Sequence, residues 1–271
     1  DEIFKIRTAK VNPHCTWSYY TDLLFCLERL AWDKLYLPIV VDILLYCCKY
    51  PRDNSHLNAP SYTLRHVFNL LLPQTHADFN QRISILQTLS QKYPKDVRVL
   101  CLEILSDLTR GEMKLNSHFQ WRGIEKHFTP LEAKTVWLKD IQQVIHLMLQ
   151  LSNWNEKEIC DYIELSFHRL MSTSRTIFLS AFFEHKAQMQ GNEQIYECLQ
   201  RNIDYHHTYD KSQYALDKEQ IKPYKDLLSA IESEDFVVRG YHRLDKILSE
   251  HIVDDGDFER KNEMKLDQLD S

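Results

Sequence analysis

Several groups of histidine, cysteine and acidic residues are the parts of this sequence whose side chains could bind a metal ion. The groups are Asp204 with His206, His207 and Asp210, then His14 with Cys15, His66 with His76, and His118 with His127. Metal sites on helices usually place ligands three or four residues apart with a carboxylate nearby, and none of these groups has that pattern cleanly. We therefore interpret them as surface or helix-capping histidines, and the sequence predicts no metal site and no cofactor.

Two short motifs could bind an ion of another kind. Residues 254–257 read Asp-Asp-Gly-Asp, but they lack the alternating carboxylates and the bidentate glutamate of a calcium loop. Residues 172–175 read Ser-Thr-Ser-Arg and could hold an anion at the start of a helix. An acidic turn and an ordinary cluster of helix N-cap residues explain the two motifs without a ligand.

The sequence contains no local motif for catalysis. Its 5 glycines are scattered, so there is no glycine-rich GxxxxGKS or GxxxxGKT loop to bind a phosphate group. A nucleophile, a base and an orienting residue cannot be assembled from neighbouring positions, although a triad dispersed along the chain stays an open alternative. We therefore expect that the chain itself is not an enzyme.

The 7 cysteines are interpreted as reduced structural thiols. Adjacent Cys47 and Cys48 cannot form an ordinary disulfide, and no CxxC pair is present. Most of the cysteines lie in segments with helical apolar periodicity, where a thiol behaves as a small hydrophobic group; these are Cys26, Cys47, Cys101, Cys160 and Cys198.

The composition favours a soluble all-α protein. The 271 residues include only 5 glycines and 8 prolines, too few for the many turns of a β-rich protein of this length. The net charge of -6, without a run of lysines or arginines, argues against nucleic acid as a ligand. The longest apolar run, residues 35–48, is interrupted by Asp42 and is too short to span a membrane.

Apolar residues recur at three-four spacing along most of the chain, which predicts a succession of helices. The predicted helices span residues 16–32, 34–50, 61–72, 79–93, 97 to about 110, 130–151, 155–170, 172–190, 193–204, 218–231 and 235–251. In the first two helices, which should pack as an antiparallel hairpin, the residues expected on the buried faces are Tyr19, Leu23, Cys26, Leu27 and Leu30, then Ile39, Ile43, Leu44 and Cys47.

Consecutive helix hairpins with short turns can stack into a superhelix or close into a bundle. The hairpin pitch of about 35–45 residues matches known solenoid repeats, but the repeats are not similar in sequence. We therefore expect an irregular α-solenoid, with a compact multi-helix domain as the alternative. The expected regions are residues 1–125, residues 126–250, continuous with the first, and an acidic, frayed tail over residues 251–271.

A fixed pattern of residues near the N-terminus carries a family resemblance. It runs from an LE-x-LAW helix through an N-x-P element to a PQT tripeptide and a later arginine, and its main residues here are Leu27, Glu28, Trp32, Asn58, Pro60, Phe68, Pro73, Gln74, Thr75 and Arg82. Over roughly residues 20–125 the chain resembles a helical-repeat region of large bacterial STAND-type anti-phage ATPases and their relatives. The resemblance implies that these residues are structural.

In that family, the resemblance implies a sensor or scaffold region, while catalysis belongs to other modules. We therefore expect a protein-binding or scaffolding domain, part of a cytoplasmic bacterial defence protein, whose partner is a phage protein or another domain of the same polypeptide. An enzyme with catalytic residues dispersed over a helical fold and a passive spacer domain are the two alternatives. The sequence does not fix the oligomeric state.

Aromatic residues in segments without helical periodicity are the best candidates for contact with a partner, because they are freer to face outward. The candidate residues are Trp121, Tyr205, His206 and Tyr209. By contrast, Trp32 stands where the first helix should end, so its indole is expected to cover the helix ends and to stabilise the fold.

Overall fold

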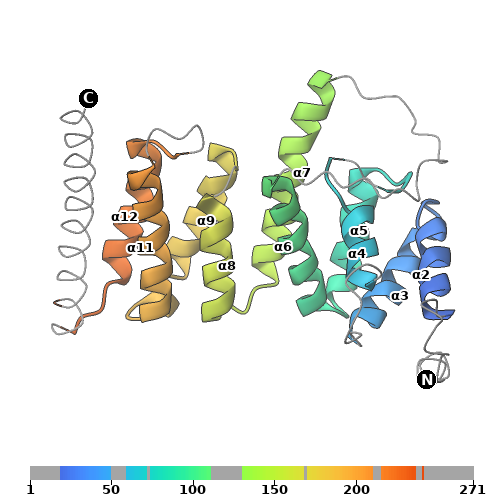
Figure 1. Cartoon of the computed structure of the whole chain (residues 1–271), viewed down its shortest axis with the longest axis horizontal. Helices are drawn as coiled ribbons and strands as arrows, with labels where there is room; N and C mark the ends of the chain where they lie inside the picture. The colour runs from blue at the N-terminus through green and yellow to red at the C-terminus, as the bar shows by residue number, and fades with distance from the viewer. Residues whose placement is uncertain are drawn as a thin grey trace, which may run out of the picture. The chain divides into compact units, whose positions relative to one another are not determined.

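The computed structural model describes residues 19–49, 59–71, 74–110, 130–167, 170–209, 215–235 and 240. Within these ranges every regular element is a helix, which confirms the all-α prediction (Figure 1). The helices are α2 (Tyr19–Leu30), α3 (Leu37–Cys48), α4 (Pro60–Val67), α5 (Phe79–Ser90), α6 (Pro94–Arg110), α7 (Pro130–Gln150), α8 (Glu156–Phe167), α9 (Ser172–Glu184), α10 (Lys186–Met189), α11 (Glu193–Thr208) and α12 (Lys218–Ile231).

The chain forms two compact units, the first ending at Ala181 and the second beginning at Phe182, within α9. Neighbouring helices pack against each other inside each unit, as in the predicted hairpins. The solenoid arrangement of the whole chain stays a prediction, as does the boundary expected near residue 125. The predicted tail over residues 251–271 lies outside the described residues.

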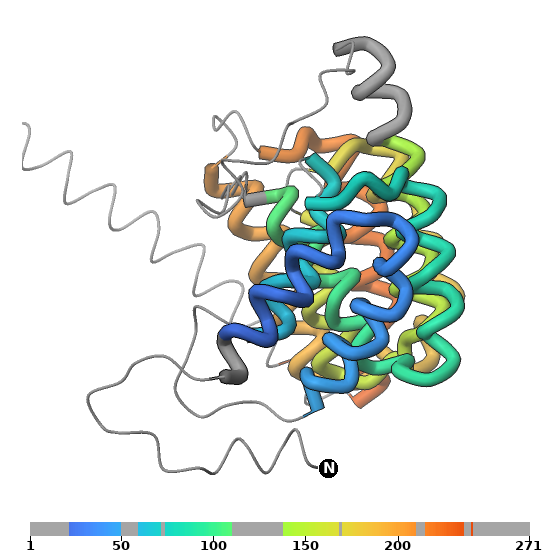
Figure 2. The backbone as a smooth tube through the Cα atoms, turned by 90° about the vertical axis from the view of Figure 1, so that its right-hand side faces the viewer, coloured from blue at the N-terminus to red at the C-terminus, as the bar shows by residue number. Residues whose placement is uncertain are grey.

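The helices of the first hairpin, α2 and α3, pack against each other as expected (Figure 2). The predicted buried faces, however, are partly wrong. In α2 the buried positions are Leu24, Leu27 and Glu28, whereas Cys26 and Leu30 are exposed. In α3 the buried residues are Leu37, Val40, Val41, Leu44, Leu45 and Cys47, and the predicted Ile39 and Ile43 point outward. Because α3 is apolar on nearly all sides, its periodicity does not identify the inward face.

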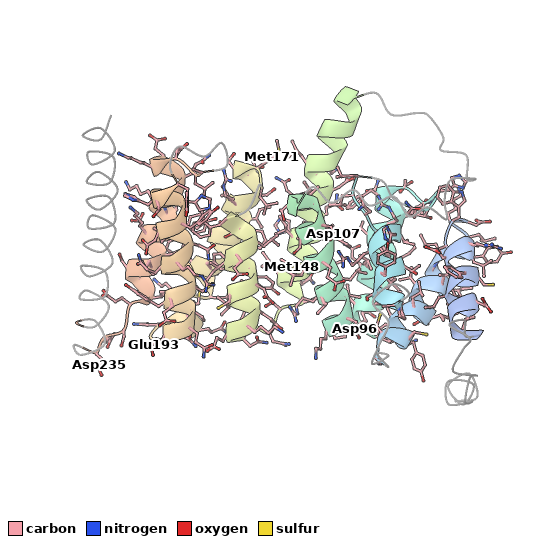
Figure 3. All side chains as sticks on the ribbon, viewed as in Figure 1. Asp96, Asp107, Met148, Met171, Glu193 and Asp235 are labelled. Carbon is pink, nitrogen blue, oxygen red and sulfur yellow. The ribbon has the colours of Figure 1, made fainter. Side chains whose placement is uncertain are left out.

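Helix α6 is the central element of the first unit, since it contacts α3, α4, α5, α7 and α8. Asp96 and Asp107 lie near its two ends (Figure 3). The three-four spacing predicts a buried face of Val97, Leu100, Cys101, Ile104, Leu105 and Leu108. The first five are buried and Leu108 is half-buried, while the polar residues Arg98 and Thr109 are buried as well. Helix α7 ends within one residue of its predicted end, whereas α4 and α5 end earlier than predicted.

In the second unit, α12 contacts both α10 and α11. Its bounds match the prediction, and a capping box formed by Asp217 and Gln220 begins it. The backbone N–H of Gly191, at φ +70°, donates to the Ile231 carbonyl at 3.0 Å, which joins the start of α11 to the end of α12. The predicted single helix over 172–190 is wrong, because α9 ends at Glu184 and α10 follows the break at His185.

Candidate functional site

The family-like residues gather around the turn that follows α2. The Trp32 carbonyl accepts the backbone N–H of His76 at 2.9 Å, and the Trp32 indole N–H donates to Nε2 of His76 at 3.0 Å. The Gln74 N–H donates to the His66 carbonyl at 3.1 Å, and the Thr75 hydroxyl accepts the Ala77 N–H at 3.2 Å. These bonds attach the segment before α5 to the ends of α2 and α4.

Most residues of the pattern are buried. The buried members are Leu27, Glu28, Pro60, Phe68, Gln74, Thr75 and Arg82, while Trp32 is half-buried. Asn58 and Pro73 lie outside the described residues. Their burial, together with the hydrogen bonds that Gln74, Thr75 and Arg82 make to or through the backbone, is what a structural role predicts.

Arg82, one of these residues, carries a buried charge. Its Nη1 donates to the Asn69 carbonyl at 3.0 Å and lies 3.5 Å from the Val67 carbonyl. Burial lowers the pKa of Arg82 to about 10, although the nearby carboxylate of Asp140 on α7 acts in the opposite direction. Burial also raises the pKa of Asp140 to about 6. The pair therefore places two partly compensated charges between α5 and α7.

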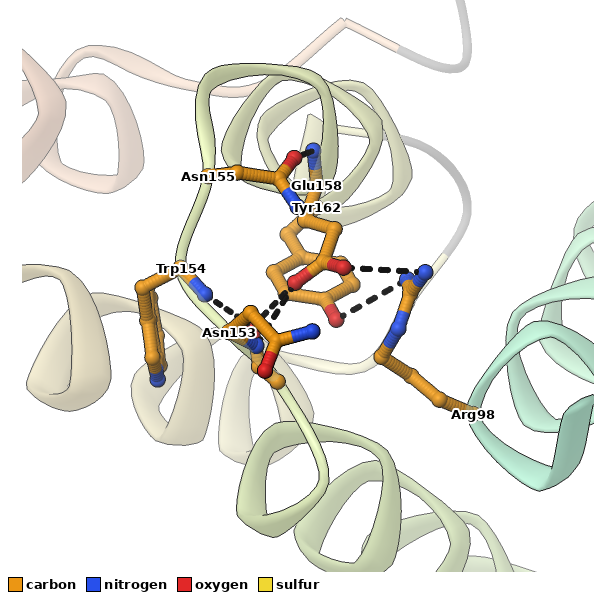
Figure 4. Close-up of polar contacts among 7 residues, drawn as sticks. Arg98, Asn153, Trp154, Asn155, Glu158 and Tyr162 are labelled. Atoms are coloured by element: carbon orange, nitrogen blue, oxygen red, sulfur yellow. Dashed lines mark hydrogen bonds and ion pairs between the residues drawn. The ribbon is translucent and has the colours of Figure 1, made fainter. Parts of the chain in front are cut away.

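A second polar cluster joins α6 to the start of α8 (Figure 4). Nη2 of Arg98 lies 3.0 Å from Oε1 of Glu158, and both side chains are less than a tenth exposed. The other carboxylate oxygen, Oε2, accepts the Ser152 hydroxyl at 2.9 Å and the Asn153 N–H at 2.8 Å. Nη1 of Arg98 lies 3.4 Å from the hydroxyl of Tyr162, which is itself buried.

The segment before α8 is shaped by this cluster. Asn155 caps the helix, since its Oδ1 accepts the Glu158 N–H at 3.1 Å. Trp154 adopts φ +54°, a left-handed conformation that is uncommon for a bulky residue. Its N–H donates to the Ser152 hydroxyl at 3.0 Å, and its ring meets that of Tyr162 edge-on at 6.0 Å. The network supplies three partners to a buried carboxylate and joins it to the Arg98 guanidinium, so its evident effect is to stabilise the fold.

The feature that fits a functional role is an exposed apolar face on α3. We define the α3 stripe as Leu35, Tyr36, Ile39, Ile43 and Tyr46, whose exposed fractions are 72%, 46%, 63%, 39% and 37%. From Tyr36 onward the residues are spaced by three, four and three, which places them along one side of a helix. The sequence prediction missed this surface because it assigned Ile39 and Ile43 to the core.

The predicted contact residues fall in different settings. The segment 205–209 was expected to lack helical structure, but residues 205–208 belong to α11, so that prediction is wrong. His206 is buried, and its Nδ1 accepts the Leu216 N–H at 3.2 Å, which makes it unsuited to partner contact. Tyr205 and Tyr209 are 61% and 55% exposed, with ring centroids 4.9 Å apart. Trp121 lies outside the described residues.

The other predicted groups are placed as follows. Among the described residues, no cluster of three or more histidine, cysteine or acidic side chains could hold a metal ion. The six cysteines of the described residues form no disulfide, and Cys26 is the exposed one among them, while Cys15 lies outside the described ranges. In residues 172–175, the Arg175 guanidinium donates to the Leu170 carbonyl at 2.8 Å.

Over the same described ranges, none of the helices is long and apolar enough to cross a membrane. Comparison with protein-family models, with curated proteins and with solved structures finds no match for this chain. The arrangement of residues in the structure is therefore the basis for the functional proposal.

Proposed function

We propose that this chain is a protein-binding helical scaffold and that the α3 stripe is its binding surface. The single observation that carries the proposal is the exposure of three large apolar side chains along one side of α3, a surface that continues through the N-cap residue Tyr36 to Leu35 in the preceding turn. At about 200 Å² for a whole large side chain, the exposed parts of the five stripe residues amount to roughly 500 Å². A contiguous apolar patch of several hundred Å² on a protein surface marks an interaction site more often than chance.

The α3 stripe is not needed to build the core. Helix α3 already buries six residues against the rest of the unit, including Val41 and Leu44, which are fully buried. Polar residues at positions 39 and 43 would therefore satisfy the fold equally well, since an outward-facing helical position normally carries them. Apolar residues at these positions raise the free energy of the exposed surface unless another molecule covers it.

The chemistry of the stripe favours protein over other ligands. Tyrosine and isoleucine side chains give large apolar contact areas, and the tyrosine hydroxyls can still reach water at the rim of an interface. Together with the resemblance to STAND-type sensor regions, this supports a scaffold or sensor domain within a cytoplasmic bacterial defence protein. In this proposal the second unit offers a smaller aromatic surface at Tyr205 and Tyr209.

Site-specific photo-crosslinking tests the proposal. The photoreactive residue p-benzoylphenylalanine is placed at Ile39 and, as a control, at Val99, an apolar residue of α6 that is 36% exposed. We expect adducts with another polypeptide chain, identified by mass spectrometry, to form in cells from position 39 and not from position 99. Equal labelling from both positions, or none from either, would show that the α3 stripe does not bind protein.

A further inference from the structure

We infer that the α3 stripe pairs with the α3 stripe of a second copy of this chain, in antiparallel orientation about a twofold axis. The inference rests on the proposed function, because it names the partner of the same surface. It starts from the order of residue types along the stripe, which reads tyrosine, isoleucine, isoleucine, tyrosine at positions 36, 39, 43 and 46. The spacings of three, four and three are the same in both directions.

A twofold interface brings the same patch of both subunits together, so that residue i meets j and j meets i. The order of residues in the stripe satisfies this condition when the two helices run antiparallel. Ile39 of one copy then lies against the partner's Ile43, and Tyr36 lies against the partner's Tyr46. Like side chains meet at these four positions, while Leu35, the fifth residue of the stripe, has no like counterpart and lies at the edge of the contact.

The spacing also defines the kind of partner. Apolar residues separated by three and four positions form the seam by which one helix inserts its side chains between those of another. An extended strand would instead present side chains with a period of two. The exposed parts of the four paired residues cover roughly 370 Å², so two copies would bury roughly 740 Å² from them, and covering Leu35 at the edge brings this to roughly 1,000 Å². That area is at the lower limit for a specific interface, which predicts a reversible dimer.

The charges near the stripe permit this pairing. Between Tyr36 and Tyr46 the only charged residue is Asp42. The twofold axis brings the two copies of Asp42 toward each other, but each carboxylate is paired within its own chain. Nζ of Lys92 lies 2.7 Å from Oδ1 and 3.0 Å from Oδ2 of Asp42. Each aspartate is therefore partly neutralised before association, which reduces the repulsion between the copies.

Two measurements test the inference with the full chain. In the first, sedimentation is followed over roughly 1–100 µM, the range expected for an interface of this size. We expect a monomer–dimer equilibrium whose dissociation constant rises at least about tenfold in Ile39→Glu and Ile43→Glu. The matched control is Val99→Glu, which also places a carboxylate at an exposed apolar position and should leave the equilibrium unchanged. Circular dichroism verifies that each variant is folded.

In the second measurement, Ile39→Cys and Ile43→Cys variants are oxidised separately and as a mixture, and the disulfides are mapped by mass spectrometry. Antiparallel pairing predicts an intermolecular bond between positions 39 and 43 that forms only in the mixture. A bond between two copies of position 39 would refute the antiparallel arrangement. This measurement does not require a destabilising charge, so it decides the geometry even if the glutamate variants fail to fold.

The outcomes separate the two proposals. A chain that stays monomeric, with position 39 crosslinked to a different protein, refutes self-association and leaves the protein-binding function standing. Crosslinks from position 39 that form within a single molecule, without a covalent dimer, would show that the chain covers its own stripe, and both proposals would then be wrong. Dimers that persist equally in Ile39→Glu and Val99→Glu would locate self-association elsewhere.

Discussion

Replacing Glu158 by glutamine should destabilise the first unit strongly, although the change is almost isosteric. In the folded chain Glu158 compensates the buried guanidinium of Arg98 and accepts hydrogen bonds from Ser152 and Asn153. Glutamine cannot neutralise Arg98, and its amide N–H₂ would face a donor on one side. Removing one partner of a buried ion pair typically costs about 3–5 kcal/mol. This is a large part of the ~5–15 kcal/mol that stabilises a domain.

Thermal unfolding followed by circular dichroism measures the effect. For a unit of this size, 1 kcal/mol shifts the Tm by about 2–4 °C, so Glu158→Gln should lower the Tm by roughly 6–20 °C. The control Glu164→Gln, at an exposed position of the same helix, should cost less than about 1 kcal/mol. The double variant with Arg98→Met should lose less than the sum of the single changes. Equal small losses for Glu158→Gln and Glu164→Gln would refute the reasoning, since the ion pair would then be acting like a solvated one.

Three further predictions concern other parts of the chain. The pKa of Asp140 is raised from 3.8 to about 6 in the folded chain. The folded state therefore keeps its full stability at low pH, where Asp140 is protonated, and becomes less stable as the pH rises through about 6 and the carboxyl loses its proton. Between pH 4 and pH 7 the free energy of unfolding of Asp140→Asn should therefore increase by about 1–3 kcal/mol relative to that of the unmodified chain. A difference in unfolding free energy between the two proteins that does not change with pH would contradict this. Trp32→Ala should cost about 2–3 kcal/mol in denaturant unfolding, below the ~3–5 of a fully buried indole because Trp32 is only half-buried, with Trp32→Phe losing less. An unchanged unfolding midpoint in Trp32→Ala would instead assign the residue to recognition. Titration with a thiol reagent should find 7 free thiols after denaturation without reductant, and in the native state Cys26 should react before Cys101, whose pKa burial raises to about 12. Fewer than 7 thiols, or rapid native labelling of Cys101, would show that the thiols are not as the structure places them.

Local signals in the sequence predicted several helices closely. Helix α12 was predicted with its observed bounds, and α6 with its buried face, because regular three-four spacing continues over both. The end of α11 was missed for a definable reason. His206 occupies the next inward position after Ile203, so the buried face continues through a polar residue that a purely apolar pattern does not count.

The sites depend on information that a local pattern does not carry. The pairing of Arg98 with Glu158 joins residues on different helices, while the sequence around Glu158 indicates only a helix start beginning at Asn155. The α3 stripe was hidden for the opposite reason. Leu44 and Ile43 are equally apolar, and only the packing of α3 against its neighbours shows which of them faces solvent.

The left-handed backbone of Trp154 restricts how this position can change over evolution. Glycine would relieve the backbone strain, which for an L-residue is about 1–2 kcal/mol, but it would remove the indole that meets Tyr162. A β-branched residue would increase the strain and restore little of the ring contact. Substitutions at residue 154 should therefore be accepted mainly when a second change around Tyr162 compensates them, so these two positions are expected to vary together among related sequences.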